Sequence, residues 1–236
     1  MINYAHRGFK GKYPENTMLA FKKAIEAGAN GIELDVHLTR DGEFVIIHDE
    51  SLERTTDGSG LICEKSLAEI KKLNASKLYP SFEKQEILTL REYFEFIKDN
   101  QVISNIELKN SIIDYKDIEK KTYDLIKDFG LVDKIIISSF NHQSLIRMKE
   151  IDSTIKCGVL ESSRLYKPWE YVKNLEMEYF HPINFAVDQE LVEKCRENNI
   201  GLNIWFGLSD YDINEYLKYD PAGLITDFPD RISTYL

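Results

Sequence analysis

The sequence has 236 residues, of which 43% are hydrophobic and 30% charged, so it can bury a substantial core and is too apolar for a disordered chain. Its net charge of −10 argues against nucleic-acid binding, because counterion release requires clustered Lys and Arg. The same charge disfavours anionic membrane surfaces, and no apolar run reaches the length of a membrane span.

The first elements alternate between strand and helix. The apolar run INYA at 2–5 predicts a strand, the amphipathic stretch 16–27 predicts a helix, and GIELDV at 31–36 predicts a second strand. The run EFVIIHD at 43–49 breaks this alternation, because a parallel strand needs a longer connection. Asp41–Gly42 is a two-residue hairpin signal, so this run is expected to pair antiparallel with the second strand and to bring His48 near Asp35.

Residues 51–101 form a long excursion before the next core strand, with helices expected at 66–73 and 89–98. Strands and helices then alternate again to the end of the chain. The further strands are expected at 102–108, 134–140, 156–160, 178–183, 201–206 and 222–227, and the further helices at 116–129, 142–151, 189–199 and 210–219. Helix 116–129 has one apolar face, and Gly130 follows it as a plausible C′ residue.

Eight strands separated by helical crossovers predict an α/β fold, either a closed (β/α)8 barrel or an open doubly wound sheet. No linker or repeat divides the chain, so we expect one domain over residues 1–236, with its oligomeric state left open. The scattered Cys63, Cys157 and Cys195 indicate unpaired thiols in a reducing compartment. Because the segment MINYAHRG is too short and too polar for a signal peptide, we expect a cytoplasmic protein.

Carboxylates at predicted strand ends indicate a metal site. Glu33 and Asp35 lie two residues apart on one strand, so both point to the same face. Burying two carboxylates is costly unless a hard cation such as Mg²⁺ or Ca²⁺ compensates them, although exposure to solvent is the commoner fate of such a pair. Glu107 and Lys109 repeat the spacing, and a salt bridge at the strand terminus is the simpler interpretation. In a barrel, however, these strand ends would meet at the active site.

His6 and His48 each end a short apolar run. Two histidines can serve as base and acid in one reaction, although a lone histidine at a strand end is more often structural. Arg7 follows His6, and its guanidinium matches the oxygens of a phosphate. Gly8 would allow a close approach of the backbone to a ligand.

These residues fall within an ordered set of short motifs that extends from residue 4 to about residue 230. The set comprises HRG at 6–8, PENT at 14–17, AF at 20–21, ELDV at 33–36, T-x-DG at 39–42, HD at 48–49, TTDGSG at 55–60, IELK at 106–109 and ITDFP at 225–229. In this order and spacing it resembles the glycerophosphodiester phosphodiesterases. The resemblance implies a TIM barrel of the phosphatidylinositol-phospholipase-C type.

The resemblance also implies an activity: hydrolysis of a small glycerophosphodiester, such as glycerophosphocholine or glycerophosphoethanolamine, to an alcohol and glycerol 3-phosphate. It implies one divalent metal ion, and leaves Mg²⁺ and Ca²⁺ both open. The family's catalytic histidines map onto His6 and His48. Its metal-binding carboxylates map onto Glu33, Asp35 and Glu107, and its phosphate-contacting arginine onto Arg7, with Lys109 nearby. Glu15 and Asn16 either support the first loop or form the turn and N-cap of the following helix.

One segment departs from the family, in which Trp is commonly followed by a Thr-Val-Asn-like sequence. Here Trp205 precedes Phe206, Gly207 and Leu208. Trp205 and Phe140 are expected either to form an apolar wall for the glycerol or head group, or to be plain core. His181 is expected to be structural, with a polar contact to substrate as the alternative.

Two other functions compete with the leading one. The first keeps the chemistry but changes the substrate, to lysophospholipids in a lysophospholipase D-type reaction or to glycerophosphoinositol. The second is a catalytically silent barrel that binds a phosphorylated ligand. The sequence also leaves open which histidine is the acid, and whether the glycerol 2-hydroxyl or water attacks the phosphorus.

Overall fold

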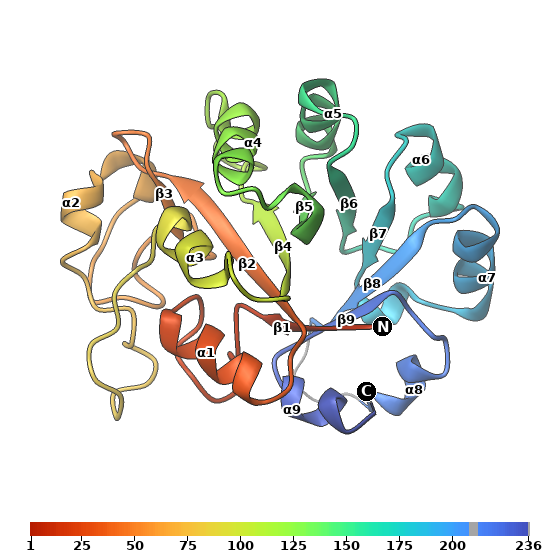
Figure 1. The fold of residues 1–236 in the computed structure, drawn as a ribbon, viewed down its shortest axis with the longest axis horizontal. Helices are drawn as coiled ribbons and strands as arrows, with labels where there is room; N and C mark the ends of the chain where they lie inside the picture. The colour runs from red at the N-terminus through yellow and green to blue at the C-terminus, as the bar shows by residue number, and fades with distance from the viewer. Residues whose placement is uncertain (208–211, 236) are drawn as a thin grey trace.

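The computed structural model describes residues 1–207 and 212–235, in which parallel strands close a barrel (Figure 1). β1 pairs in parallel with both β2 and β9, so the sheet is closed and the open-sheet alternative is wrong. Eight strands form the barrel, in the spatial order β1 (Ile2–His6), β2 (Gly31–Leu38), β4 (Ile103–Leu108), β5 (Ile135–Ser139), β6 (Lys156–Glu161), β7 (Tyr179–Pro182), β8 (Gly201–Trp205) and β9 (Gly223–Thr226). The fold is therefore a TIM barrel, as expected.

Helices between the strands cover the outside of the barrel (Figure 1). The predicted ones are found as α1 (Met18–Glu26), α4 (Ile118–Asp128), α5 (His142–Ile151), α7 (Gln189–Glu197) and α8 (Asn214–Leu217). Residues 208–211, where the helix predicted at 210–219 would begin, lie outside the described residues. Gly130 has a φ of +66°, which confirms it as the C′ residue of α4. None of the helices in the described ranges is long and apolar enough to span a membrane.

Two helices were not expected from the sequence: α6 (Pro168–Asn174) and α9 (Pro229–Ile232). Each begins with proline, whose fixed φ suits the first helical position. Both are too short to display a clear apolar periodicity, which explains why the pattern did not reveal them.

The predicted hairpin is present. β3 (Phe44–Ile46) pairs antiparallel with β2 outside the barrel, with Leu38 opposite Phe44. The turn runs through residues 40–42, one more than the predicted two, and is closed by a bond from the Thr39 amide to the Glu43 carbonyl. Beyond β3, the Ile47 amide donates to the Asp35 carbonyl at 3.1 Å. This contact carries His48 to the carboxyl end of β2, as predicted.

The excursion after the hairpin contains a short 3₁₀-helix (Ile62–Glu64), α2 (Leu67–Ile70) and α3 (Leu90–Ile97). Apolar residues of the excursion pack against two residues of the hairpin, Val45 and Ile47, in a cluster with Leu52, Ile62, Ile70, Ala75 and Ile87. Because this cluster joins the excursion to the hairpin, the excursion has a defined position beside the mouth of the barrel (Figure 1).

Candidate active site

A cavity of about 380 Å³ opens at the carboxyl end of the barrel strands. Nine residues were expected to act in catalysis, metal binding or substrate contact, and eight of them line it: His6, Arg7, Glu33, His48, Glu107, Lys109, Phe140 and Trp205. The exception is Asp35, which lies just behind the cavity wall with 1% of its surface exposed. The fold therefore brings together residues from β1, β2, the hairpin, β4, β5 and β8.

Strand alternation explains the acidic cluster. Ile32 and Leu34 of β2 face the outer core, so Glu33 and Asp35 point into the barrel. Asp35 lies opposite Glu107 in the β2–β4 register. One oxygen from each of the three carboxylates lies within 4.8 Å of the other two, and the residues are only 1–8% exposed. Glu33 and Asp35 are therefore buried, and the alternative in which both face solvent is wrong.

Electrostatics within the cluster favour a bound cation. Burial and the neighbouring carboxylates raise the pKa of Glu33, and burial raises that of Glu107 to about 7 despite Lys109. Burial also acts to raise the pKa of Asp35, but the charges of Arg7, His48 and Lys109 outweigh it and hold that pKa below its usual range. Within residues 1–207 and 212–235, the buried Oδ1 of Asp35 finds no hydrogen-bond partner. Closely spaced oxygen donors of this kind fit a hard divalent cation.

Arg7 is held by carboxylates on several sides. Its Nη1 donates to Glu15 Oε1 at 2.9 Å, its Nε lies 3.4 Å from Asp35 Oδ2, and its amide donates to Glu33 Oε2 at 3.0 Å. The residue has a φ of +54°, a conformation that non-glycine residues adopt rarely and often at functional sites. Gly8 has a φ of +78°, and a Cβ there would lie 2.8 Å from the backbone of Ala20 in α1, so packing against α1 requires glycine at this position.

Lys109 bridges the acidic cluster and His48. Its Nζ donates to Glu107 Oε1 at 2.8 Å and to His48 Nε2 at 3.2 Å, and lies 3.8 Å from Asp35 Oδ1. Burial lowers its pKa, but the charges of Glu107 and Asp35 outweigh burial and raise the pKa overall, so it is an ammonium group. The expected salt bridge between Glu107 and Lys109 is therefore present, and it belongs to a larger network that includes His48 and Asp35.

The two histidines share one local arrangement. His6 Nδ1 donates to Asp227 Oδ1 and His48 Nδ1 pairs with Asp49 Oδ1, both at 2.6 Å. Since an ammonium group only donates, His48 Nε2 accepts from Lys109, which places the proton of the neutral ring on Nδ1. Burial and the charge of Arg7 lower the pKa of His6 to about 4, and burial lowers that of His48. Each ring thus turns its Nε2 away from its carboxylate.

Several residues of this network were missed at the level of sequence. Asp49 and Asp227 lay within the quoted HD and ITDFP motifs, so the motifs contained the signal without a role for it. Lys10 lies 3.2 Å from Asp227 Oδ2 and lines the cavity. Arg54, in the sequence LERTT, binds both Asp49 and Glu15. Nothing in the local pattern distinguished these two cations from surface charges.

The PENT segment supports the first loop. Glu15 accepts from Arg7, and Asn16 Nδ2 donates to Asp35 Oδ2 at 2.9 Å. Neither residue is the N-cap of α1, because Thr17 accepts from the Ala20 amide in that role. The alternative N-cap function for Glu15 and Asn16 is therefore wrong, and the capping residue is the Thr at the end of the same motif.

An aromatic pair also lines the cavity. Phe140 and Trp205 meet edge to face with ring centroids 6.2 Å apart, and Phe206 lies beside them. Leu208, at the end of the departing segment, lies outside the described residues. His181 is fully buried, accepts from Asn203 Nδ2 at 2.9 Å and does not line the cavity, as the structural interpretation predicted.

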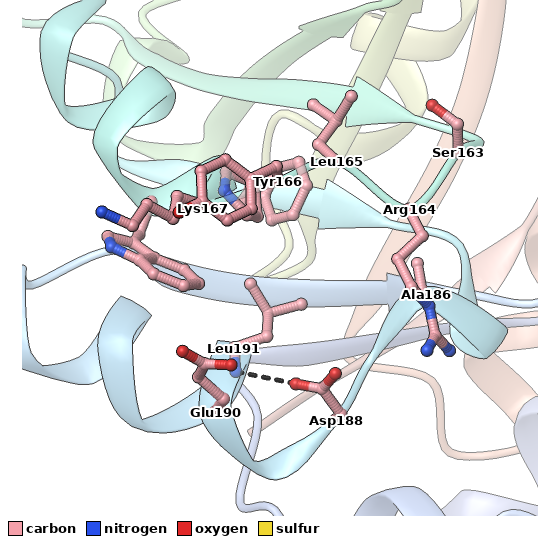
Figure 2. A pocket seen from close by; sticks show the side chains of 12 residues that line it. Ser163, Arg164, Leu165, Tyr166, Lys167, Ala186, Asp188, Glu190 and Leu191 are labelled. Carbon is pink, nitrogen blue, oxygen red and sulfur yellow. Dashed lines mark hydrogen bonds between the residues drawn. The ribbon is translucent and has the colours of Figure 1, made fainter.

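A second pocket lies on the flank of the barrel, between the loop 163–167 and the start of α7 (Figure 2). Its carboxylate Asp188 accepts from the Leu191 amide at 3.0 Å and so caps α7 (Figure 2). The residues singled out from the sequence do not line it. The chemistry-bearing side chains therefore belong to the central cavity.

The sequence profile of the Glycerophosphoryl diester phosphodiesterase family matches residues 6–231. The chain belongs to this family. It is 43% identical over 229 residues to the glycerophosphodiester phosphodiesterase of Caldanaerobacter subterraneus subsp. tengcongensis, an alignment that covers 97% of this chain and 94% of that protein.

Solved structures agree with this family membership. The glycerophosphodiester phosphodiesterase of Thermotoga maritima superposes with a TM-score of 0.79 at 30% identity, covering 100% of this chain and 99% of that one. A phosphodiesterase of Oleispira antarctica, solved with its product sn-glycerol-3-phosphate, gives a TM-score of 0.86 at 28% identity and covers 98% of this chain and 94% of that one. This member of the family is thus an enzyme, a phosphoric diester hydrolase.

Proposed function

We propose that this enzyme hydrolyses small glycerophosphodiesters to an alcohol and glycerol 3-phosphate with one divalent metal ion and a pair of histidines. The observation that carries the proposal is that His6 and His48 line the same cavity as Glu33 and Glu107, which form a close cluster with Asp35. The glycerol phosphate held by the Oleispira relative supports the product. We further propose that residues 1–236 act as a single cytoplasmic catalytic unit.

Glu33, Asp35 and Glu107 would hold the metal, which when bound supplies positive charge to the phosphate oxygens. Both Mg²⁺ and Ca²⁺ suit an all-oxygen set of ligands. Arg7 and Lys109 line the same cavity and add two further positive charges. Together with a divalent ion they exceed the three carboxylates by one charge, which matches a phosphodiester that carries one negative charge.

The histidines would move protons at their Nε2 atoms, because each Nδ1 is committed to a carboxylate. One ring in its protonated form donates to the departing alkoxide, and the other in its neutral form accepts a proton from the nucleophile. The nucleophile is either the glycerol 2-hydroxyl, which gives a cyclic phosphate first, or water. Arg7 orients the phosphate between the rings, so that both proton transfers occur without large movement of the side chains.

The aromatic wall favours a second substrate class. Phe140, Trp205 and Phe206 offer apolar surface to the cavity, and Phe140 is 37% exposed. A lysophospholipid could extend an apolar chain along this side. We therefore keep a lysophospholipase D-type reaction as the second candidate.

Purified enzyme tests the proposal directly. Release of glycerol 3-phosphate is measured for a panel of glycerophosphodiesters, and release of the acylated glycerol phosphate for lysophospholipids, in EDTA and after addition of Mg²⁺ or Ca²⁺. We expect turnover that EDTA abolishes, and a loss of ~10²-fold or more in both His6→Ala and His48→Ala. His142→Ala, which changes a histidine outside the cavity, is the control expected to retain activity. Full turnover in either site variant, or ligand binding without turnover in the wild type, would overturn the proposal.

A further inference from the structure

Arg54 lies on the excursion, where it binds two carboxylates at once. Its Nε and Nη2 donate to Asp49 at 2.6 and 2.9 Å, and its Nη1 and Nη2 donate to Glu15 at 2.9 and 2.8 Å. The planar guanidinium group matches a carboxylate with two parallel bonds, and here it matches two carboxylates. A lysine, with one charged nitrogen, cannot reproduce this arrangement.

Each of the two carboxylates also holds a residue of the proposed machinery. Glu15 accepts from Arg7, and Asp49 pairs with His48 Nδ1. The contacts therefore form a continuous chain from Arg7 through Glu15, Arg54 and Asp49 to His48. The chain joins two segments far apart in sequence, the first loop of the barrel and the end of the hairpin.

The partial burial of this series of contacts makes its geometry specific. The Glu15 side chain is only 6% exposed, and that of Asp49 is 27% exposed. Burial acts to raise the pKa of both carboxylates, but hydrogen bonds from Arg54 help to lower each pKa to about 2. Both groups therefore stay ionised, and each needs a cationic partner that solvent replaces poorly.

We infer that Arg54 is a positioning residue for phosphodiester hydrolysis, which fixes His48 relative to Arg7 by binding their carboxylate partners Asp49 and Glu15. This inference rests on the proposed function, in which His48 moves a proton and Arg7 orients the phosphate. Arg54 itself does not line the cavity. It acts through Asp49 and Glu15.

Arg7 and His48, the two ends of this series of contacts, respond differently when Arg54 is changed. Arg7 keeps its contacts with Glu33 and Asp35, so the site for the phosphate remains largely formed. The ring of His48 depends on Asp49 at its Nδ1, and Asp49 loses its bidentate partner. We therefore expect a fall in kcat that exceeds any rise in KM.

The test compares Arg54→Lys and Arg54→Ala with the wild-type enzyme on a glycerophosphodiester that the wild type hydrolyses. Each variant is expected to lose ~10- to 100-fold in kcat, the usual effect of removing a partner that orients a reacting group. Added guanidinium ion is expected to restore part of the activity of Arg54→Ala and none of that of Arg54→Lys, in which the lysine fills the space. Arg54→Lys also keeps the inference testable if Arg54→Ala does not fold.

Arg40→Ala is the matched control. Arg40 pairs with Glu69 of the excursion at 3.1 Å, a contact that is not part of the network from Arg7 to His48, so Arg40→Ala is expected to keep wild-type kcat. Asp49→Asn is combined with Arg54→Lys in a double-mutant cycle, in which the two losses are expected to be less than additive.

Unchanged kcat in both Arg54 variants would overturn the inference. A merely structural role would also overturn it. In that case the losses of kcat would follow the fall in melting temperature, guanidinium would restore no activity, and the losses would add fully to that of Asp49→Asn. The wild type and His48→Ala are assayed in parallel. An inactive wild type or a fully active His48→Ala refutes the proposed function instead, so the two failures are distinguishable.

Discussion

The two histidine arms of the site reach the same local geometry from different scaffolds. His6 ends β1, and its partner Asp227 directly follows β9, the neighbouring strand of the barrel. His48 follows β3 outside the barrel, and its partner Asp49 is the next residue, which Arg54 of the excursion secures. Both Nδ1–carboxylate distances are 2.6 Å. Both arms thus fix the orientation of a histidine ring, the first through the closed sheet and the second through a network of ion pairs.

Removal of the carboxylate partners tests whether the arms are equivalent. Asp227→Asn and Asp49→Asn each are expected to lower kcat/KM ~10- to 100-fold, because an amide holds the ring less firmly and favours the Nδ1-protonated tautomer less strongly than a carboxylate does. Asp227→Asn is expected to lose more, since its side chain is 18% exposed against 27% for Asp49, and water replaces the lost contact less readily. Steady-state kinetics at pH 7 measure both. Equal activity of the Asp227 variant and the wild type would contradict the comparison.

The carboxylates proposed to bind the metal, Glu33, Asp35 and Glu107, line or adjoin the same cavity as both histidines, and metal binding is expected to stabilise the whole site. At a concentration one hundred times its dissociation constant, Mg²⁺ or Ca²⁺ would add about 2.7 kcal/mol to the free energy of unfolding. This corresponds to a rise of roughly 5 °C or more in melting temperature for a chain of this size. Differential scanning fluorimetry with and without EDTA measures the rise.

Glu33→Gln separates metal binding from repulsion between the carboxylates. It is expected to abolish the rise, and to raise the melting temperature in EDTA because one buried negative charge is removed. Lys12→Ala, which changes an exposed ion pair, serves as the control with an unchanged metal response. A metal-induced rise of wild-type size in Glu33→Gln would contradict the assignment.

The smallest expected effect is on the stability of the protein at acid pH, through the Glu15 carboxylate that Arg54 binds. Burial acts to raise the pKa of Glu15, but Arg54 and Arg7 lower it to about 2, below its ordinary value near 4.3 in the unfolded chain. The stabilisation is therefore fully present above about pH 4.3 and is lost as pH falls towards 2. Glu15→Gln is expected to show a shallower fall in unfolding free energy between pH 5 and pH 3. Urea denaturation at these pH values measures the slope, and identical slopes would contradict the prediction.

Local patterns predicted the hairpin and the shared direction of the two carboxylates of β2, but they left open whether those carboxylates are buried. Alternation along β2 places Glu33 and Asp35 on one face, and Asp41–Gly42 predicts the reversal that carries His48 back. The choice of a closed barrel came from the family resemblance, because the same alternation of strands and helices also fits an open sheet.

Contacts across long separations could not be predicted from spacing. His6 and Asp227 are 221 residues apart and meet only because β9 closes onto β1. Arg54 and Glu15 are 39 residues apart, and their contact depends on how the excursion packs against the hairpin. Register and loop packing decide such pairs, and neither leaves a mark in the local sequence.

The position of Arg54 limits how the excursion can be exchanged between relatives. A graft that replaced this segment would keep the barrel and all three carboxylates, yet it would separate Glu15 and Asp49 from the cation that joins them. A compatible donor must therefore supply an arginine at the same place beside the cavity. The first loop, the hairpin end and this part of the excursion constitute one transplantable unit, although they are scattered along the chain.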